Sequence, residues 1–316
     1  VDRPIDAEPA PFVPFETALE YVSDLLDEAY NDLLAGGSAF PFPVAPGFTG
    51  FSTPQTFAQF NRALAAKVLV HRATFVGCTS CWSQASAALA ASFVTDTDLP
   101  ESLTTGVYFG YTGASGEPAN PISEPLSNDR LWVHSSIVNG AQTRPDGSPD
   151  LRLTRKVMDA GRVRELAGLV GTHKPILYNS ESNPAQADPG ADIPWIDNEE
   201  LLLLRAEIRW HTGDRAGAIA DIDRIREHSG GLGPSGLTPS SSDDEFITEL
   251  LYNRLYSLMW RNGTRWIDAR RYNRTHTLPL DRPGDVIFPS MVVPANECTA
   301  RRLSPPCEPL KQQQGG

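Results

Sequence analysis

No group of residues in this sequence has the spacing of a known catalytic or metal-binding motif. Its six histidines are scattered, at positions 71, 134, 173, 211, 228 and 276. Neither an HExxH motif nor a Walker A motif occurs. Carboxylate pairs such as Asp96 and Asp98 are expected in any acidic chain, and without a cleft the choice between them is arbitrary. The residues therefore indicate no catalytic site, no metal site and no cofactor.

The segment 231–236, GLGPSG, is a literal GxGxxG sequence. In a dinucleotide-binding protein these glycines follow a strand, and a helix comes directly after them so that its N-terminus meets the phosphates. Here the segment follows a predicted helix and contains Pro234. We interpret it as a linker.

The four cysteines fall into two close pairs, Cys78 with Cys81 and Cys298 with Cys307. Such pairs are compatible with local disulfides and an oxidising compartment, whereas a CxxC motif can also be redox-active or supply half of a zinc site. No second CxxC and no His pair follows at ligand spacing, which disfavours zinc. We expect a disulfide between Cys298 and Cys307, and another between Cys78 and Cys81.

Side chains that could bind a small ligand are concentrated in the middle of the chain. Aromatic rings in loops can stack on sugar faces, while neighbouring amides, carboxylates and guanidinium groups reach hydroxyls. The segment 126–134, LSNDRLWVH, has this composition. The alternative, in which Trp132 is a core ring and the polar residues form a turn, stays open. The predicted ligand site consists of Trp132, Tyr108, Tyr111, Asn128, Asp129 and Arg130.

Composition excludes several classes of partner. The chain has 316 residues, of which 40% are hydrophobic, enough for a core in one large domain or two. The net charge of −12 opposes binding to nucleic acid or to an anionic membrane surface. No apolar run is long enough for a membrane-spanning helix. The first residues, VDRPIDAEPAPFVP, show no signal-peptide pattern and no initiating Met, as in a mature or truncated piece.

The clearest structural element is a helical hairpin. Apolar residues at helical spacing predict helices at 199–211 and 215–228, separated by Gly213. The small residues Ala206 and Ala218 would let two antiparallel helices approach closely. Their separation along the sequence is that of the small residues in a tetratricopeptide repeat. Any other helical hairpin with small contact residues remains an alternative.

Periodicity predicts further helices at 15–34, 55–75 and 244–261, and a shorter one at 83–93. Asp221 is expected on the polar face of its helix, pointing away from the core. The fold class that follows is all-α, with tetratricopeptide-like hairpins.

Between the hairpins, the region 95–194 holds no convincing long helix. Its short apolar pieces VYFGY and LWVHSSIV could be strands, and residues 162–169 could be a helix or a strand. A loop-rich insert of this length is abnormal in a pure scaffold and is typical of a functional region. The last residues, 273–316, are predicted to be irregular.

The segment 261–274, RNGTRWIDARRYNR, resembles the late motif of the RagB/SusD family of nutrient-uptake outer-membrane lipoproteins. The matching positions are Gly263, Arg265, Trp266, Asp268 and Arg271. Arg261 and Asn262 depart from the acidic version of this motif. Further segments are similar to family elements in the same order: the helices 15–33 and 60–73, the Asp150-Leu-Arg152 element, the hairpin 198–227 and the segment 288–298.

The resemblance implies one SusD-like unit over residues 1–316. In it, 12–94 and 195–272 form the helical scaffold, 95–194 the irregular ligand-binding part and 273–316 an irregular tail. The late motif is then structural, with Trp266 in the core and with Arg265 and Asp268 satisfying buried polar partners.

The resemblance also implies a function without catalysis. Such proteins lie on the extracellular face of the outer membrane and deliver glycans or other nutrients to a SusC-like, TonB-dependent transporter. Members normally carry a signal peptide, a lipidated cysteine and a first helical repeat, roughly a third of the protein that this chain lacks. Contact with the membrane is then expected only through that absent lipid anchor, and no nucleic acid is expected as a partner.

Two alternatives remain. A tetratricopeptide adaptor for other proteins would have free thiols and a regular repeat throughout, which the long middle region argues against. An α-helical glycan-active enzyme would need two carboxylates facing each other across a cleft.

Overall fold

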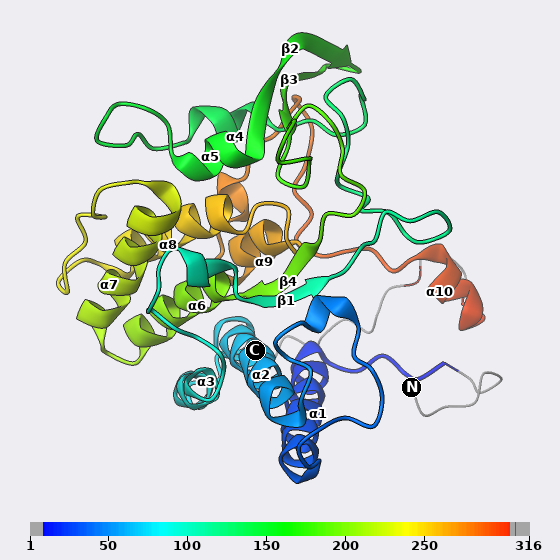
Figure 1. Ribbon diagram of the computed structural model, residues 1–316, viewed down its shortest axis with the longest axis vertical. Helices are drawn as coiled ribbons and strands as arrows, with labels where there is room; N and C mark the ends of the chain where they lie inside the picture. The colour runs from blue at the N-terminus through cyan, green and yellow to red at the C-terminus, as the bar shows by residue number, and fades with distance from the viewer. Residues whose placement is uncertain (1–8, 304–306, 308–316) are drawn as a thin grey trace.

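Helices make up most of the regular structure, as a computed structural model shows (Figure 1). It describes residues 9–303 and 307. In the described part of the chain the α-helices are α1 (Phe15–Ala35), α2 (Pro54–Val76), α3 (Cys81–Ala90), α4 (Ser135–Asn139), α5 (Leu151–Lys156), α6 (Asn198–His211), α7 (Arg215–Ile225), α8 (Asp243–Ser257), α9 (Thr264–Arg271) and α10 (Ala295–Ala300). The strands are β1 (Gly106–Phe109), β2 (Val157–Leu166), β3 (Leu169–Pro175) and β4 (Ile193–Asp197). The predicted all-α, tetratricopeptide-like fold class is confirmed.

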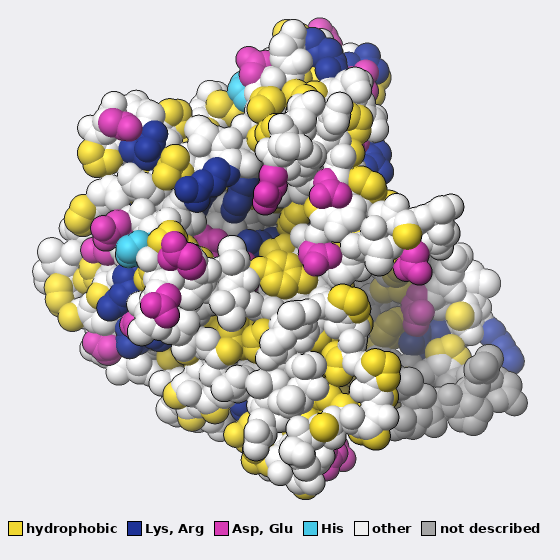
Figure 2. Space-filling model, viewed as in Figure 1, with side chains coloured by type: hydrophobic (Ala, Val, Ile, Leu, Met, Phe, Trp, Pro, Cys, Tyr) yellow, Lys and Arg dark blue, Asp and Glu magenta, His cyan; other side chains and the backbone are white. Residues whose placement is uncertain are grey.

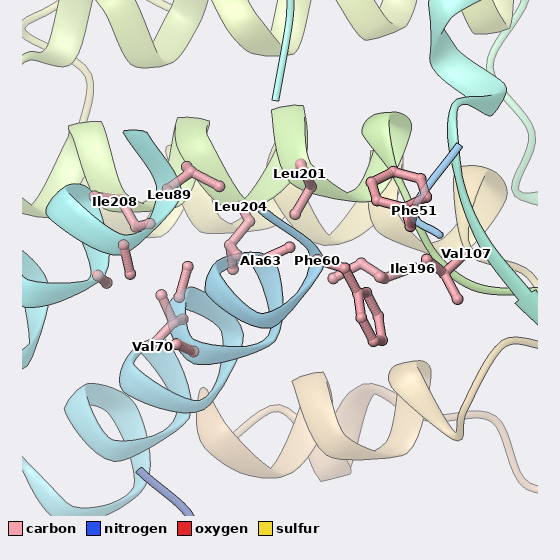
Figure 3. Close-up of a cluster of buried hydrophobic side chains, with 14 residues drawn as sticks. Phe51, Phe60, Ala63, Val70, Leu89, Val107, Ile196, Leu201, Leu204 and Ile208 are labelled. Carbon is pink, nitrogen blue, oxygen red and sulfur yellow. The ribbon is translucent and has the colours of Figure 1, made fainter. Parts of the chain in front are cut away.

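The N-terminal helices pack against the central ones around one apolar core. Helix α2 begins at Pro54 because Thr53 caps it, with its hydroxyl accepting from the backbone N–H of Thr56. Its small buried residues face α3 and α6, where Leu201 and Leu204 project into the same cluster (Figure 3). Side chains of β1 and β4 close this cluster at one end.

The central hairpin is formed by α6 and α7, as predicted. Ala206 and Ala218 are both fully buried, so the two helices meet through small side chains. The prediction that Asp221 points away from the core is wrong. Its carboxylate is fully buried and accepts from Arg205 at 2.7 Å and from Arg209 at 2.8 Å, because α6 supplies both arginines on the facing side.

Helix α8 begins with a capping box, in which Ser242 and Glu245 satisfy each other's backbone N–H groups. It ends at Ser257, earlier than predicted, because the following turn contains positive φ angles at Trp260 and Asn262. These backbone conformations cannot continue an α-helix.

The late motif is partly structural in the way predicted. Asp268 is buried and accepts from Arg254 at 2.7 Å and from Arg271 at 2.8 Å. The prediction that Trp266 lies in the core is wrong. Its ring is only half-buried, lies under the guanidinium of Arg270 at 4.3 Å, and donates to the carbonyl of Phe288 at 3.0 Å.

The middle region contains two small antiparallel sheets. Strand β1 pairs with β4, and β2 with β3, so residues 162–169 adopt the strand alternative around a tight turn. The expected strand in LWVHSSIV is reduced to one bridge at Val133, because His134 caps α4 directly afterwards. Helices in this region are short, as predicted.

Both expected disulfides are present. The Cα atoms of Cys78 and Cys81 are 5.4 Å apart, and those of Cys298 and Cys307 are 5.6 Å apart. None of the described helices combines the length and apolar character that crossing a bilayer requires.

Candidate functional site

Three of the predicted ligand-binding residues line one groove beside the β2–β3 hairpin. Asp129, Arg130 and Trp132 border it together with Arg164 and the apolar residue Leu169. We call this the Trp132 groove. Its volume is about 270 Å³, and its walls combine an aromatic ring, aliphatic side chains and both signs of charge. This mixture is typical of sites for small polar ligands.

The ring of Trp132 is held rigidly in a half-buried position. Its indole N–H donates to the carbonyl of Asp129 at 3.0 Å. A Cβ atom on Gly171 would lie 2.7 Å from the ring, so only glycine lets the indole pack on β3 at this point. The cations of Arg162 and Lys174 lie 5.2 and 5.0 Å from the ring centre, within cation–π distance. Trp132 is therefore not a core ring.

The loop that carries Trp132 is organised by a buried ion pair. Glu124 and Lys174 are almost fully buried and contact each other directly. Glu124 also accepts from Nε of Arg130 at 3.1 Å, and Lys174 donates to the carbonyl of Asn128 at 2.8 Å. The amide oxygen of Asn128 accepts from the backbone of Arg130 at 3.2 Å. Asn128 thus shapes the loop from behind the groove, whereas Arg130 both shapes the loop and lines the groove.

Asp129 in this groove does not have the character of a glycosidase general acid. A hydrogen bond from Arg162 lowers the pKa of Asp129, so this carboxylate stays ionised at neutral pH. Asp281, the other groove carboxylate, lies 3.0 Å from His134. Glycoside hydrolysis requires one carboxyl with a raised pKa as the general acid. Asp129, whose pKa is lowered, does not have that property.

Tyr108 lines a different hollow, of about 510 Å³, together with Gln59 and Asp192. Its hydroxyl donates to the carbonyl of Thr104, and burial raises the pKa of Tyr108 to about 12. The backbone N–H of Tyr111 donates to Asp192 at 2.9 Å, so both predicted tyrosines border the same carboxylate.

One wall of this Tyr108 hollow depends on a glycine. A Cβ atom on Gly47 would lie 2.1 Å from the carbonyl oxygen of Tyr108. The turn Pro46–Phe48 can therefore approach β1 only because position 47 has no side chain.

A network of charges lies next to the Tyr108 hollow. The guanidinium of Arg261 donates to Asp197 at 2.6 Å, and both side chains are nearly buried. Besides burial, which raises the pKa of Tyr108 and Tyr178, the charges of Asp197 and Arg261 have the largest effects on both phenols. The hydroxyl of Tyr178 is buried without a hydrogen-bond partner in the described structure. These four groups are therefore neighbours.

Lys156 extends this network. Burial lowers the pKa of its amine to about 7, and the amine donates to the carbonyls of Tyr256 and Ser257 at 2.6 and 2.7 Å.

On the face shown in Figure 2 the surface is hollowed between the helices and the irregular part, with Lys and Arg side chains visible inside the hollow and Asp and Glu side chains at its edge.

The structure thus divides the six predicted residues between two places. Trp132, Asp129 and Arg130 share the Trp132 groove, with Asn128 in the loop behind it, whereas Tyr108 and Tyr111 meet at Asp192. Neither hollow contains both Trp132 and a predicted tyrosine among its lining residues.

Sequence reasoning missed Gln59, Asp192 and Arg261. Only Arg261 carried a signal, because it departs from the acidic form of the late motif. Within the described residues no group of His, Cys, Asp and Glu is arranged to hold a metal ion.

Comparison with known proteins identifies the fold. No family model matches this sequence, and no curated protein sequence matches it. A protein of Bacteroides vulgatus ATCC 8482, proposed to be an outer membrane protein involved in nutrient binding, superposes with a TM-score of 0.67 at 14% identity over 96% of this chain and 73% of its own length.

Two further solved structures agree. A SusD superfamily protein from the same organism gives a TM-score of 0.57 at 16% identity over 92% of this chain and 68% of its own. NanU of B. fragilis gives 0.53 at 14% identity over 84% of this chain. The chain spans only 64% of the length of NanU.

The likeness to these structures shows that the chain has the fold of the SusD superfamily. The RagB/SusD resemblance of its motifs is thereby confirmed at the level of the fold.

Proposed function

We propose that this protein is a non-catalytic nutrient-binding protein of the outer-membrane surface. Its ligand is an oligosaccharide, which it delivers to a SusC-like, TonB-dependent transporter, and a lipid anchor outside this chain attaches the full-length protein to the membrane. The SusD fold supports this proposal, as does the solved relative that is itself proposed to bind nutrients at the outer membrane.

The observation that carries the proposal is the Trp132 groove. A half-buried indole, fixed by Gly171 and by its bond to Asp129, needs no ordering when a sugar face stacks on it. Charged groups at the same groove, Arg130 and Arg164, can donate to sugar hydroxyls. The ionised Asp129 can accept from them but cannot protonate a leaving group, which favours binding over hydrolysis.

A glycan array with the purified chain should first identify a ligand. Trp132→Ala is then expected to weaken its binding at least tenfold, about 1.4 kcal/mol, because few contacts dominate such sites. The melting temperature should stay nearly unchanged, since the ring is outside the apolar core clusters. Isothermal titration calorimetry measures the affinity.

Two control variants locate the effect. Tyr21→Ala removes an exposed ring on α1, far in sequence from the groove, and should leave affinity unchanged. Gln59→Ala removes an amide from the Tyr108 hollow. If Trp132→Ala has no effect while Gln59→Ala weakens binding, the function stands and the ligand lies in the Tyr108 hollow. If no glycan binds the unmodified chain, the oligosaccharide proposal fails.

A further inference from the structure

A cleft among the scaffold helices lies outside both hollows of the candidate site. It has a volume of about 390 Å³ and is bordered by α1, α2, α9 and Arg254 of α8. Aliphatic walls come from Val22, Leu64 and Ile267, and an aromatic wall from Trp195. We call this the α1–α2–α9 cleft. Its size is in the range of small-molecule sites.

Polar groups in this cleft have unused hydrogen-bonding capacity. Arg254 is 3% exposed and donates from Nε to Asp268, but its Nη1 has no hydrogen-bond partner. Leaving a buried guanidinium donor unsatisfied costs free energy, which a bound acceptor would recover. Lys67 also borders the cleft, with its amine 2.7 Å from Glu200.

The third polar group of the cleft is His71, whose pKa depends on burial and on the charges around the cleft. Burial lowers its pKa, and the charges of Arg271, Lys67 and Arg254 lower it further, to about 3, against the opposing charge of Asp268. The imidazole is therefore neutral at physiological pH and offers one donor and one acceptor. Burial disfavours any charge in the cleft, whereas the charges of Arg271, Lys67 and Arg254 disfavour a cation and favour an anion.

We propose that the α1–α2–α9 cleft binds a small amphipathic monocarboxylate. Its carboxylate lies against Arg254, Lys67 and His71, and its apolar body lies along the aliphatic walls and Trp195. Aliphatic walls alone fit any apolar molecule, whereas the donors of Arg254, Lys67 and His71 on the same cleft select for an acceptor that carries negative charge. This site is independent of the oligosaccharide site proposed above.

Phenylacetate is a suitable probe, with phenylacetamide as its uncharged match. Isothermal titration calorimetry should detect binding of the acid, with the amide at least tenfold weaker. Equal binding of acid and amide, or no binding of the acid at millimolar concentration, would overturn the proposal.

A pair of charge variants tests the position without disturbing the core. Val22 is 40% exposed at the cleft, so Val22→Asp and Val22→Lys should both fold. The aspartate should weaken phenylacetate binding about fivefold and the lysine should strengthen it, as expected for a charge a few ångströms from the carboxylate at the protein surface.

Matched variants at Leu34 are the control. Leu34 is 60% exposed on the same helix, about 18 Å further along it, so Leu34→Asp and Leu34→Lys should leave binding unchanged. His71→Leu removes the neutral donor and should also weaken binding, while circular dichroism checks that the variant folds. If the sign of the charge at Val22 has no effect, the carboxylate does not bind in this cleft.

Discussion

Arg152→Met is expected to destabilise the protein strongly, although the residue lines neither hollow. Arg152 is 1% exposed and contacts Asp150 through two nitrogens, at 3.0 and 2.6 Å. Its remaining nitrogen donates to Asn253 at 2.9 Å and to Ser257 at 3.0 Å. The side chain therefore joins α5, at the base of the β2–β3 hairpin, to α8 of the helical scaffold.

The magnitude follows from what the substitution leaves behind. Burial opposes ionisation of Asp150, but the hydrogen bond and charge of Arg152 outweigh it and keep the pKa of Asp150 below its ordinary value. In Arg152→Met this fully buried carboxylate keeps only neutral donors, such as the hydroxyl of Tyr252 at 2.9 Å. Breaking a buried pair in this way costs about 3–5 kcal/mol.

Urea unfolding followed by circular dichroism measures this loss at pH 7. The double variant Asp150→Asn, Arg152→Met leaves neither charge of this pair and is expected to recover about half of the loss or more, since replacing both partners of a buried pair is often close to neutral. Arg282→Met breaks an exposed pair with Asp285 and should cost under about 1 kcal/mol. The reasoning is refuted if Arg152→Met costs as little as Arg282→Met.

Two further predictions concern the packing of Trp132 and the dependence of stability on pH. Gly171→Ala should displace the indole of Trp132, because the new Cβ would lie 2.7 Å from it, and cost about 1–3 kcal/mol together with a change in near-ultraviolet circular dichroism. Acid should destabilise the fold. Burial raises the pKa values of Asp150, Glu207 and Asp268, but hydrogen bonds and charges from arginine partners lower them by more, so all three pKa values lie below their ordinary values. Their contribution is complete above about pH 5 and lost as the pH falls below about 4, which urea midpoints at several pH values should show.

The helices could be predicted from the sequence because their signals are local. Thr53 with Pro54, and Ser242 with Glu245, mark helix starts within four residues. The irregular part has no such signals, since its stabilising partners are distant: Lys174 contacts a carboxylate fifty positions earlier in the chain. The composition of residues 95–194 predicted that this part is irregular, but it could not predict the contacts within it.

The candidate site shows the same limit. Asp129, Arg130 and Trp132 are close in sequence and share one groove. The expected addition of Tyr108 depended on how β1 is placed, and pairing of β1 with β4 fixes Tyr108 beside Asp192 instead. The error at Asp221 has a similar cause, because a polar face at helical spacing does not reveal that a neighbouring helix carries arginines.

The pairing of β1 with β4 has a consequence for how such proteins diversify. Residues 110–192 leave the helices at the end of β1 and return at the start of β4, and paired antiparallel residues lie about 5 Å apart. The two ends of the inserted segment therefore stay the same short distance apart, whatever the length of the chain between β1 and β4. Insertions or deletions in the loops of this part can leave the scaffold helices in position as long as the contact of α5 with α8 through Arg152 is kept, so these loops can vary in length and sequence more freely than the scaffold.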